Sequence, residues 1–357
     1  MENEKNIYLS SFSASGYQNL LKSSFRAYSD NIIYIIKGAS SSIRSMFISQ
    51  IKEQIKKEGY FCDTVLSPGS DAKIEGVIFN EIGLYIFDGT NENFFEELLD
   101  CNIFLINLGE CVNRKEIYEK RELIFKHIKD KKLFEEKSKK YLSTVISMKN
   151  DIDRTVGKSL NAEKIERFVT RFVKKEFGTV GEKCGDAKYC YISAFSGEDT
   201  VTLFDTIRES CARIYIIDDK LNIVTNTLIL QLKDAAVLCG YDVICCLDNI
   251  SSKEIEHLII PELSLCIFSS NIYHQWIGDY TKKINSIRFT DREIIKAHKN
   301  RVDFNIDAIE ELLSQAKTNL HNAKKEEKKI DEIYLQFLDK SKLENAVSKT
   351  TDEIFRQ

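Results

Sequence analysis

Short runs of hydrophobic residues alternate along this chain with stretches in which hydrophobic residues recur at helical spacing. The runs are rich in β-branched residues and predict strands, whereas the spaced positions lie on one helix face. In the first third we expect strands at 7–9, 32–37, 60–66, 84–87 and 103–108, and helices at 43–57, 71–79 and 94–99. Gly59 is suited to end the first helix. The alternation predicts an α/β fold with a mainly parallel sheet covered on both faces.

The pattern of the first half returns in the second. The segment from Tyr34 to Phe87 aligns without a gap with the segment from Tyr215 to Phe268, with about 17 identities over about 54 positions. A period of this length is too long for a solenoid and indicates a duplicated domain. We therefore predict two tandem domains, at 1–180 and 181–357.

Each predicted core is followed by a highly charged stretch with hydrophobic residues at helical intervals, at about 113–177 and 291–357. Coiled-coil hairpins and solvated helices packed on their own domain both fit this pattern. The stretches hold corresponding places in the two halves, which suggests that they pack together. We expect them to form a helical interaction or lid element.

Composition narrows the range of partners. The 51 Lys and Arg residues against 55 Asp and Glu residues give a net charge of −4, which argues against a nucleic-acid binder that relies on a basic surface. We see neither an apolar run of membrane-spanning length nor a secretory signal. We expect a cytoplasmic protein whose partners are proteins, or a second copy bound through the helical extensions, and neither nucleic acid nor membrane.

The ten cysteines form no CxxC pair. Several of them, including Cys62, Cys239 and Cys266, lie in apolar or helical surroundings. We interpret the cysteines as buried free thiols.

The loop after the second predicted strand resembles a phosphate-binding loop. In a working P-loop, GxxxxGK[ST], backbone amides cradle the phosphates, the lysine contacts the terminal phosphates and the hydroxyl binds Mg²⁺. The eight positions here are Gly38, Ala39, Ser40, Ser41, Ser42, Ile43, Arg44 and Ser45. Isoleucine replaces the second glycine, where a Cβ hinders close approach of the backbone, and arginine is not equivalent to lysine.

An anion could still bind at Gly38, Ser40, Ser41, Ser42, Arg44 and Ser45. The predicted strand at 84–87 is followed by Asp88, which suits a carboxylate that organises Mg²⁺, although a plain turn aspartate fits equally well. ATP and Mg²⁺ are thus the candidate cofactors, and we assign no catalytic residue and no other metal site.

The matching loop of the second half departs further from the motif. It contains Asp218 and Asp219 where phosphate would lie, while Thr225 and Asn226 stand at the lysine and serine positions. Two carboxylates repel an anion at close range, so we expect no nucleotide there. His274 follows the last strand-like run on a loop of the kind where ligands bind, but we interpret it as a surface histidine.

These motifs resemble a bacterial family of predicted ATPases with two tandem P-loop NTPase domains, each followed by a helical insertion. The resemblance is carried by 11–17, by Lys37, Gly38 and Ser45, by 86–90, by 106–109, and in the second half by 194–198 and 272–274. Asn91, Glu92 and Asn93 replace the A-P-H that follows D-G-T in the family.

The resemblance implies an ATPase, but the departures fall on the phosphate-binding positions of both halves. We therefore expect a non-hydrolysing pseudo-ATPase that acts as a scaffold or regulatory partner. Two alternatives remain open. One is an ATP-binding protein or slow ATPase that uses the first-half site. The other is a helical interaction module held by two inert α/β cores.

Overall fold

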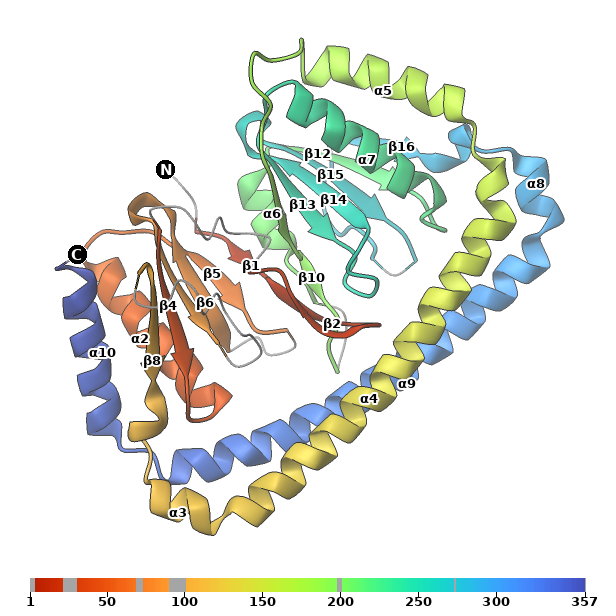
Figure 1. The fold of residues 1–357 in the computed structure, drawn as a ribbon. Coiled ribbons are helices and arrows are strands. Elements are labelled where there is room, and N and C mark those ends of the chain that lie inside the picture. Colours follow the sequence, from red (N-terminus) through yellow and green to blue (C-terminus); the bar gives the residue numbers. More distant parts are fainter. Residues whose placement is uncertain are drawn as a thin grey trace. The chain divides into compact units, whose positions relative to one another are not determined.

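The computed structural model describes residues 4–21, 31–68, 73–89, 101–197, 201–272 and 274–356. The chain forms two compact units that interleave along the sequence, whereas the predicted domains are consecutive segments. Unit 1 comprises Met1–Tyr8, Phe25–Glu136 and Asn319–Gln357, and unit 2 comprises Leu9–Ser24 and Lys137–Thr318. Each unit contains one six-stranded sheet (Figure 1).

The sheet of unit 1 has the order β1 (Asn6–Ile7), β5 (Asp63–Leu66), β6 (Ile74–Phe79), β7 (Leu84–Asp88), β4 (Ile32–Lys37) and β8 (Ile103–Asn107). Strand β6 is antiparallel to both of its neighbours, and all other neighbouring strands are parallel. Strands β4, β7 and β8 run in the same direction, so their carboxyl ends meet at one edge. That edge carries the candidate phosphate loop.

The sheet of unit 2 has the order β16 (Lys282–Asn285), β12 (Arg213–Asp218), β15 (Leu265–Ser270), β14 (Ile255–Ile260), β13 (Val243–Leu247) and β9 (Ala187–Cys190). Strand β14 is antiparallel to both neighbours, and the remaining pairs are parallel. Read from the other edge, this is the topology of unit 1, strand for strand. The duplication seen in the sequence is therefore present in the fold.

One predicted element is wrong. The segment 71–79 was expected to be a helix, but its described part contains strand β6. The last four residues of β6 are all buried, and a short, fully buried strand has no alternating pattern to distinguish it from a helix segment. Each sheet nevertheless remains mainly parallel, as predicted, with one antiparallel strand. The predicted helix at 94–99 lies outside the described residues.

Each sheet is covered by the helix that follows its candidate loop: α2 (Ser41–Lys57) in unit 1 and α7 (Ile223–Leu238) in unit 2. Residues Ile43, Phe47, Ile51 and Ile55 of α2 are fully buried, as their spacing predicts. Gly59 follows the helix with φ +96°, the left-handed conformation expected of a residue after a helix end.

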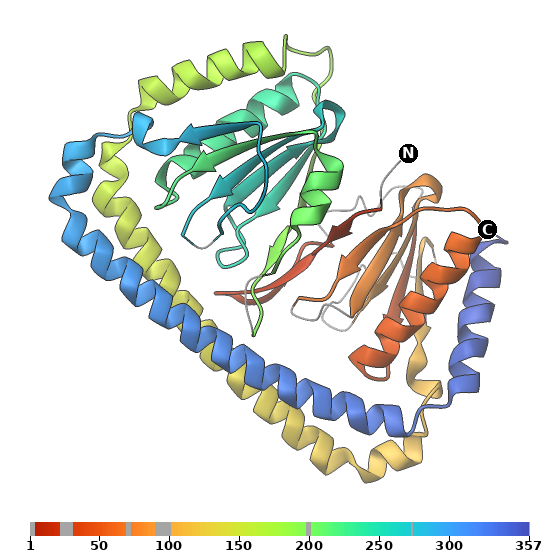
Figure 2. The same ribbon diagram turned by 180° about the vertical axis from the view of Figure 1, so that it is seen from behind.

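The charged stretches form three helices each: α3 (Arg114–Glu119), α4 (Arg121–Val156) and α5 (Ala162–Glu176), then α8 (Arg292–Ala297), α9 (Lys299–Gln336) and α10 (Lys340–Ile354). Helices α4 and α9 pack against each other, as both views show (Figures 1 and 2). The expectation that the two stretches pack together is confirmed.

The last helix of each stretch packs on the core of the other half of the repeat. Helix α10 lies against α2 in unit 1, where Leu343 and Val347 join the core. Helix α5 lies against α7 in unit 2, where Ile165, Phe168 and Phe172 do so. The two units interleave along the chain because of this exchange of helices and because Leu9–Ser24 belongs to unit 2.

The remaining short elements complete the units. They are β2 (Ser10–Ser13), β3 (Gly16–Asn19), β10 (Ser193–Ala194), β11 (Val201–Thr202), α6 (Phe204–Ser210), and the 3₁₀ turns η1 (Asn80–Ile82), η3 (Leu108–Glu110), η4 (Gly157–Ser159), η5 (Pro261–Leu263) and η6 (Ser286–Phe289).

Candidate functional site

The candidate phosphate loop of unit 1 connects β4 to α2, as the sequence predicts. Its retained glycine, Gly38, has φ +79°, and a Cβ there would lie 2.3 Å from Asn107 Oδ1 and 2.6 Å from the amide nitrogen of Gly109. The turn after β8 therefore packs directly on the loop. Glycine is required at this position for that contact and for its backbone conformation.

Arg44, at the lysine position of the motif, is directed back into the protein. Its Nε lies 2.8 Å from Asp88 Oδ2, and its Nη1 donates to the carbonyl oxygens of Gly38 and Ala39 at 3.1 and 2.9 Å. The side chains of Arg44 and Asp88 are only 7% and 13% exposed. The sequence singled out both residues, and the structure joins them as a buried ion pair. Arg44 thus holds the loop closed, and Asp88 balances its charge.

Ser45, at the Mg²⁺-binding position of the motif, also contacts protein. Its Oγ accepts a hydrogen bond from the backbone N–H of Ile74 at 2.9 Å, which attaches α2 to the start of β6. Ser40 precedes the helix and is buried, and its Oγ has no hydrogen-bond partner in the part of the chain that the structure describes.

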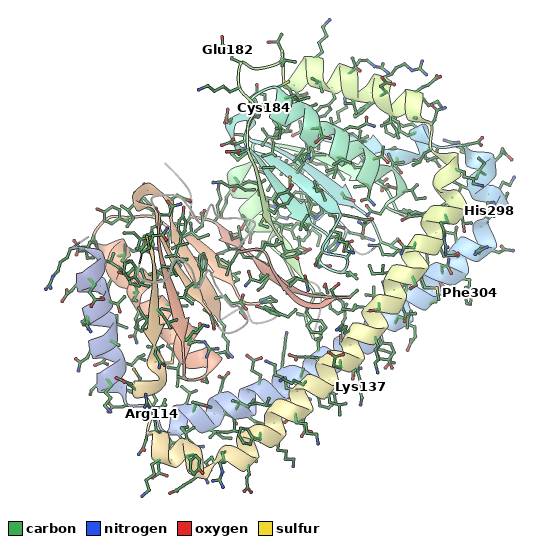
Figure 3. The ribbon with its side chains drawn as sticks, in the orientation of Figure 1. Arg114, Lys137, Glu182, Cys184, His298 and Phe304 are labelled. Atoms are coloured by element: carbon green, nitrogen blue, oxygen red, sulfur yellow. The ribbon has the colours of Figure 1, made fainter. Side chains whose placement is uncertain are left out.

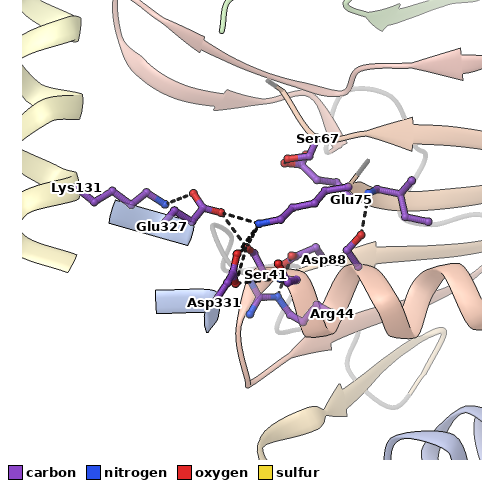
Figure 4. A network of polar contacts seen from close by, with 12 residues as sticks. Ser41, Arg44, Ser67, Glu75, Asp88, Lys131, Glu327 and Asp331 are labelled. Carbon is purple, nitrogen blue, oxygen red and sulfur yellow. Dashed lines mark hydrogen bonds and ion pairs between the residues drawn. The ribbon is translucent and has the colours of Figure 1, made fainter. Parts of the chain in front are cut away.

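Two carboxylates from α9 lie at the N-terminus of α2, where a phosphate would bind (Figure 4). Asp331 Oδ1 accepts the backbone N–H of Ser42 at 3.1 Å. Ser41 Oγ lies 2.8 Å from Glu327 Oε1 and 3.3 Å from each oxygen of Asp331. A helix N-terminus stabilises negative charge, and here the chain supplies that charge itself.

Two lysines balance these carboxylates. Lys73 Nζ lies 2.6 Å from Asp331 Oδ2 and 3.7 Å from Glu327 Oε1, and Lys131 Nζ of α4 lies 2.8 Å from Glu327 Oε2. Burial disfavours the charge on Glu327, but Lys131 and Lys73 outweigh burial and lower its pKa to about 2. Burial likewise opposes the charge on Asp331, and Lys73 with the Ser42 N–H lowers its pKa. Both side chains are therefore anions at neutral pH.

No sequence motif predicts this half of the site. Asp331 and Glu327 are separated from Ser41 by 290 and 286 residues and follow no motif. The only signal available was the helical stretch itself, whose charged positions could not be assigned to a partner before the fold was known.

In unit 2 the helix N-terminus is occupied by a carboxylate of the loop itself. Asp219 Oδ2 accepts the backbone N–H groups of Val224 and Thr225 at 2.7 and 2.9 Å, and Thr225 Oγ1 at 3.1 Å. Asp219 is 3% exposed, and burial raises its pKa. Asp218 instead pairs with Lys283 at 2.8 Å. Of the two aspartates predicted to repel an anion, one occupies the anion position.

The charged group formed by Glu327, Asp331 and Lys73 has a counterpart in unit 2, in which two of the three charges have the opposite sign. The repeat places Lys149 and Asp153 of α4 at the positions of Glu327 and Asp331, and Glu254 at the position of Lys73. These residues line a cavity of about 10 Å³, room for roughly one water molecule. Lys149 pairs with Asp248 at 2.7 Å. Burial and the neighbouring Glu254 raise the pKa of Asp153 to about 6.

His274 is not the surface residue that we expected. It is 5% exposed, and its Nδ1 lies 3.0 Å from Glu256 Oε1. Burial disfavours a charged His274, but Glu256 outweighs burial and raises its pKa. The neighbouring His257 accepts the backbone N–H of Ser269 through Nδ1. The group is a buried polar network formed by β14, β15 and the segment that follows β15. Tyr273 lies outside the described residues.

All ten cysteines are free thiols, and most are buried or half-buried, as predicted; Cys101 and Cys184 are the exposed exceptions. Burial raises the pKa of Cys62 to about 11 and that of Cys245 to about 12. Thiols with such pKa values are poor nucleophiles at neutral pH.

No group of three or more His, Cys, Asp and Glu residues in the described ranges could hold a metal ion. Helices that are both long and apolar enough to cross a membrane are likewise absent from that part of the chain. No protein-family model, curated protein or solved structure matches the sequence.

Proposed function

We propose that this protein is a non-hydrolysing, P-loop NTPase-like pseudo-ATPase that acts as a scaffold or regulatory partner of other proteins. The observation that carries the proposal is the carboxylate of Asp331 on the N-terminus of α2. A bound phosphate would have to displace this carboxylate and to separate Lys73 from both acidic residues. The anion position is therefore already occupied when the protein is folded.

The state of Arg44 supports the same conclusion. A P-loop lysine must be free to contact the terminal phosphates. Arg44 instead donates to Asp88 and to two loop carbonyls, so a change of rotamer would leave a buried carboxylate and two carbonyl groups without this donor. Asp88 is equally unsuited to organise Mg²⁺ while it neutralises Arg44.

Unit 2 supports the proposal independently. There the amides of Val224 and Thr225 donate to Asp219, a residue of the same loop. A carboxylate thus occupies the helix N-terminus in both copies, although the two carboxylates come from different parts of the chain. Because different carboxylates occupy the equivalent position in the two copies, we infer that neither copy binds nucleotide.

Titration calorimetry with Mg-ATP and with Mg-ADP, together with a coupled assay of phosphate release, tests this proposal. The wild-type protein should give neither saturable binding heat nor turnover. Saturable binding abolished by Ser42→Pro, or turnover abolished by Asp88→Asn, would instead favour the alternative of a slow ATPase that uses the first-half site.

The double variant Asp331→Asn/Glu327→Gln is the informative companion. It removes both negative charges from the N-terminus of α2 and leaves Arg44 and Asp88 in place. We expect inorganic phosphate or sulfate to bind this variant more tightly than the wild type, still without hydrolysis. Glu332→Gln, one residue along α9 and exposed, is the matched control and should leave anion binding unchanged.

A further inference from the structure

Unit 1 contains an open groove of about 360 Å³ beside the candidate phosphate loop. Val112, Ile117, Ile124 and Tyr334 give it an apolar lining, and Ala39 of the loop lies at one side. It is formed by α3, the first turns of α4 and the end of α9. Its size is within the range of sites that bind small molecules or parts of protein partners.

Two aromatic side chains stand exposed on this groove. Tyr118 and Phe125 line it and are 66% and 65% exposed. On α4, Phe125 and Ile128 are spaced to lie on one face, so an exposed apolar residue follows the groove along the helix. Exposed aromatic residues beside an arginine have the composition of protein-interface hot spots.

The second copy of the repeat provides an internal comparison. Ser138 and Ala316 are 178 residues apart, and the same offset relates α3 to α8 and α5 to α10 at both ends of each helix. At that offset the buried Ile124 corresponds to Val302, which is also buried. The exposed Tyr118 and Phe125 correspond to Lys296 and Asp303.

The fold therefore requires an apolar residue at the buried position but not at the exposed ones. Leu123 and Leu133 follow the same rule: both are exposed, and their counterparts are Arg301 and Glu311. The second copy forms the same kind of helix with charged residues at all four positions. At these four positions the exposed apolar side chains are therefore particular to unit 1, and the requirements of the helix do not explain them.

The charges of the groove favour one kind of occupant. Its charged lining residues are Arg114 and Arg121. Arg121 lies over the ring of Tyr118 at 4.5 Å, so the aromatic residue and the positive charge form one surface. Glu110 and Glu122 lie 3.7 Å from these arginines, but such exposed pairs contribute little. A partner with acidic residues next to an apolar face complements this lining.

We propose that this groove binds an amphipathic α-helix of a partner protein, with its apolar face on Tyr118 and Phe125 and acidic residues facing Arg114 and Arg121. Helix-in-groove binding uses apolar anchors at i, i+3, i+4 and i+7, which suits a groove bordered by helices. The inference supplies the partner surface that the scaffold role requires, and rests on that part of the proposed function. It does not depend on whether nucleotide binds.

The test is selection of peptides from a displayed library of helix-forming sequences, about 16 residues long, against the full chain. Selected peptides should combine helically spaced apolar residues with Asp and Glu. Their affinity, measured by fluorescence anisotropy, should fall at least about tenfold for the double variant Tyr118→Lys/Phe125→Asp, which carries the second copy's residues. Arg121→Gln should weaken binding most at low salt.

Phe304→Asp is the matched control, because Phe304 on α9 is 66% exposed but belongs to unit 2 (Figure 3). This variant should bind the selected peptides like the wild type, and thermal unfolding should be unchanged in both variants. The proposal is overturned if no peptide is enriched, if binding survives the double variant, or if basic peptides are selected.

Sedimentation velocity of the wild type and the double variant tests whether the groove binds a second copy of this chain instead. Self-association that the double variant abolishes would make a second copy of the chain the occupant and would overturn the assignment of a separate partner. Nucleotide titration of the same variants keeps the two proposals apart. Failure of the groove proposal would leave the result with Mg-ATP unchanged.

Discussion

Ser138 Oγ donates a hydrogen bond to the carbonyl oxygen of Ala316 at 3.0 Å, and these two residues occupy the same position of the repeat, 178 residues apart. Both are fully buried. Two copies of one helical segment therefore meet at their equivalent residues, and small side chains there permit close approach of the helices. Around this contact α4 and α9 are antiparallel, with Arg301 and Asn305 of α9 bonded to Asp151 of α4.

The small size of Ala316 should matter more than the hydroxyl of Ser138. Ala316→Leu introduces three carbon atoms where α4 and α9 are already in close contact, and it should destabilise the protein by about 1–3 kcal/mol. Ser138→Ala removes one hydrogen bond and should cost about 1 kcal/mol. Urea unfolding of the two variants measures the difference. A larger loss from Ser138→Ala would mean that the hydroxyl, and not the packing, determines this contact.

The Arg44–Asp88 pair should behave as a structural element. Asp88→Ala leaves a buried guanidinium without its carboxylate and should cost about 3–5 kcal/mol. Arg44→Met/Asp88→Ala removes both charges and should recover part of that loss. A double-mutant cycle in urea measures the coupling. Additive effects of the two single substitutions would show that Arg44 and Asp88 do not stabilise each other.

The α9 carboxylates at the N-terminus of α2 should make unit 1 sensitive to acid. The folded-state pKa of Glu327, about 2, is below its usual value, so its contribution is complete above about pH 4.3 and is lost as the pH falls towards 2. Glu327→Gln should therefore show a smaller decrease in stability between pH 5 and pH 2.5 than the wild type. Denaturant midpoints across this range measure it. Equal decreases in both proteins would contradict the ion pairing of Glu327 with Lys131 and Lys73.

His257 should produce a separate pH dependence in unit 2. Burial lowers its pKa to about 4; the charge of His274 acts in the same direction, and the charges of Glu256 and Asp248 oppose it. A lowered histidine pKa means that the folded state favours the neutral imidazole. Its contribution is complete above about pH 6.5 and is lost, up to roughly 3 kcal/mol, as the pH falls through 4.

His257→Asn keeps an acceptor for the Ser269 N–H but does not titrate in this range. We expect the variant to be less stable than the wild type at pH 7.5 but to lose less stability between pH 6.5 and 4. Glu256 and His274 are present in both proteins, so the difference between the two pH profiles reports the titration of His257 together with its coupling to these two groups. A pair of parallel profiles would indicate that His257 is already charged in the folded protein.

The sequence determined the duplication, most of the strands and the position of each candidate loop. These features are local: β-branched runs, helical spacing and a gapless repeat are visible without any long-range contact, and the strand–loop–helix at Gly38 was found in this way. The substitutions at Ile43 and Arg44 already predicted that the loop is poor at binding phosphate. They could not indicate what occupies the loop instead.

Only the tertiary structure decided that occupant. Asp331 reaches the amide of Ser42 across 289 residues of sequence, and helical periodicity does not specify the partner of a charged face. The same limit applies to α5 and α10. Their apolar faces predict that each helix packs on a core, but not whether that core belongs to the first or the second half of the repeat. Strand β6 does not match the predicted helix because burial of its last four residues removes the alternation that marks a strand. His274 was misplaced because burial of a histidine depends on a carboxylate, here Glu256, that only folding brings to it.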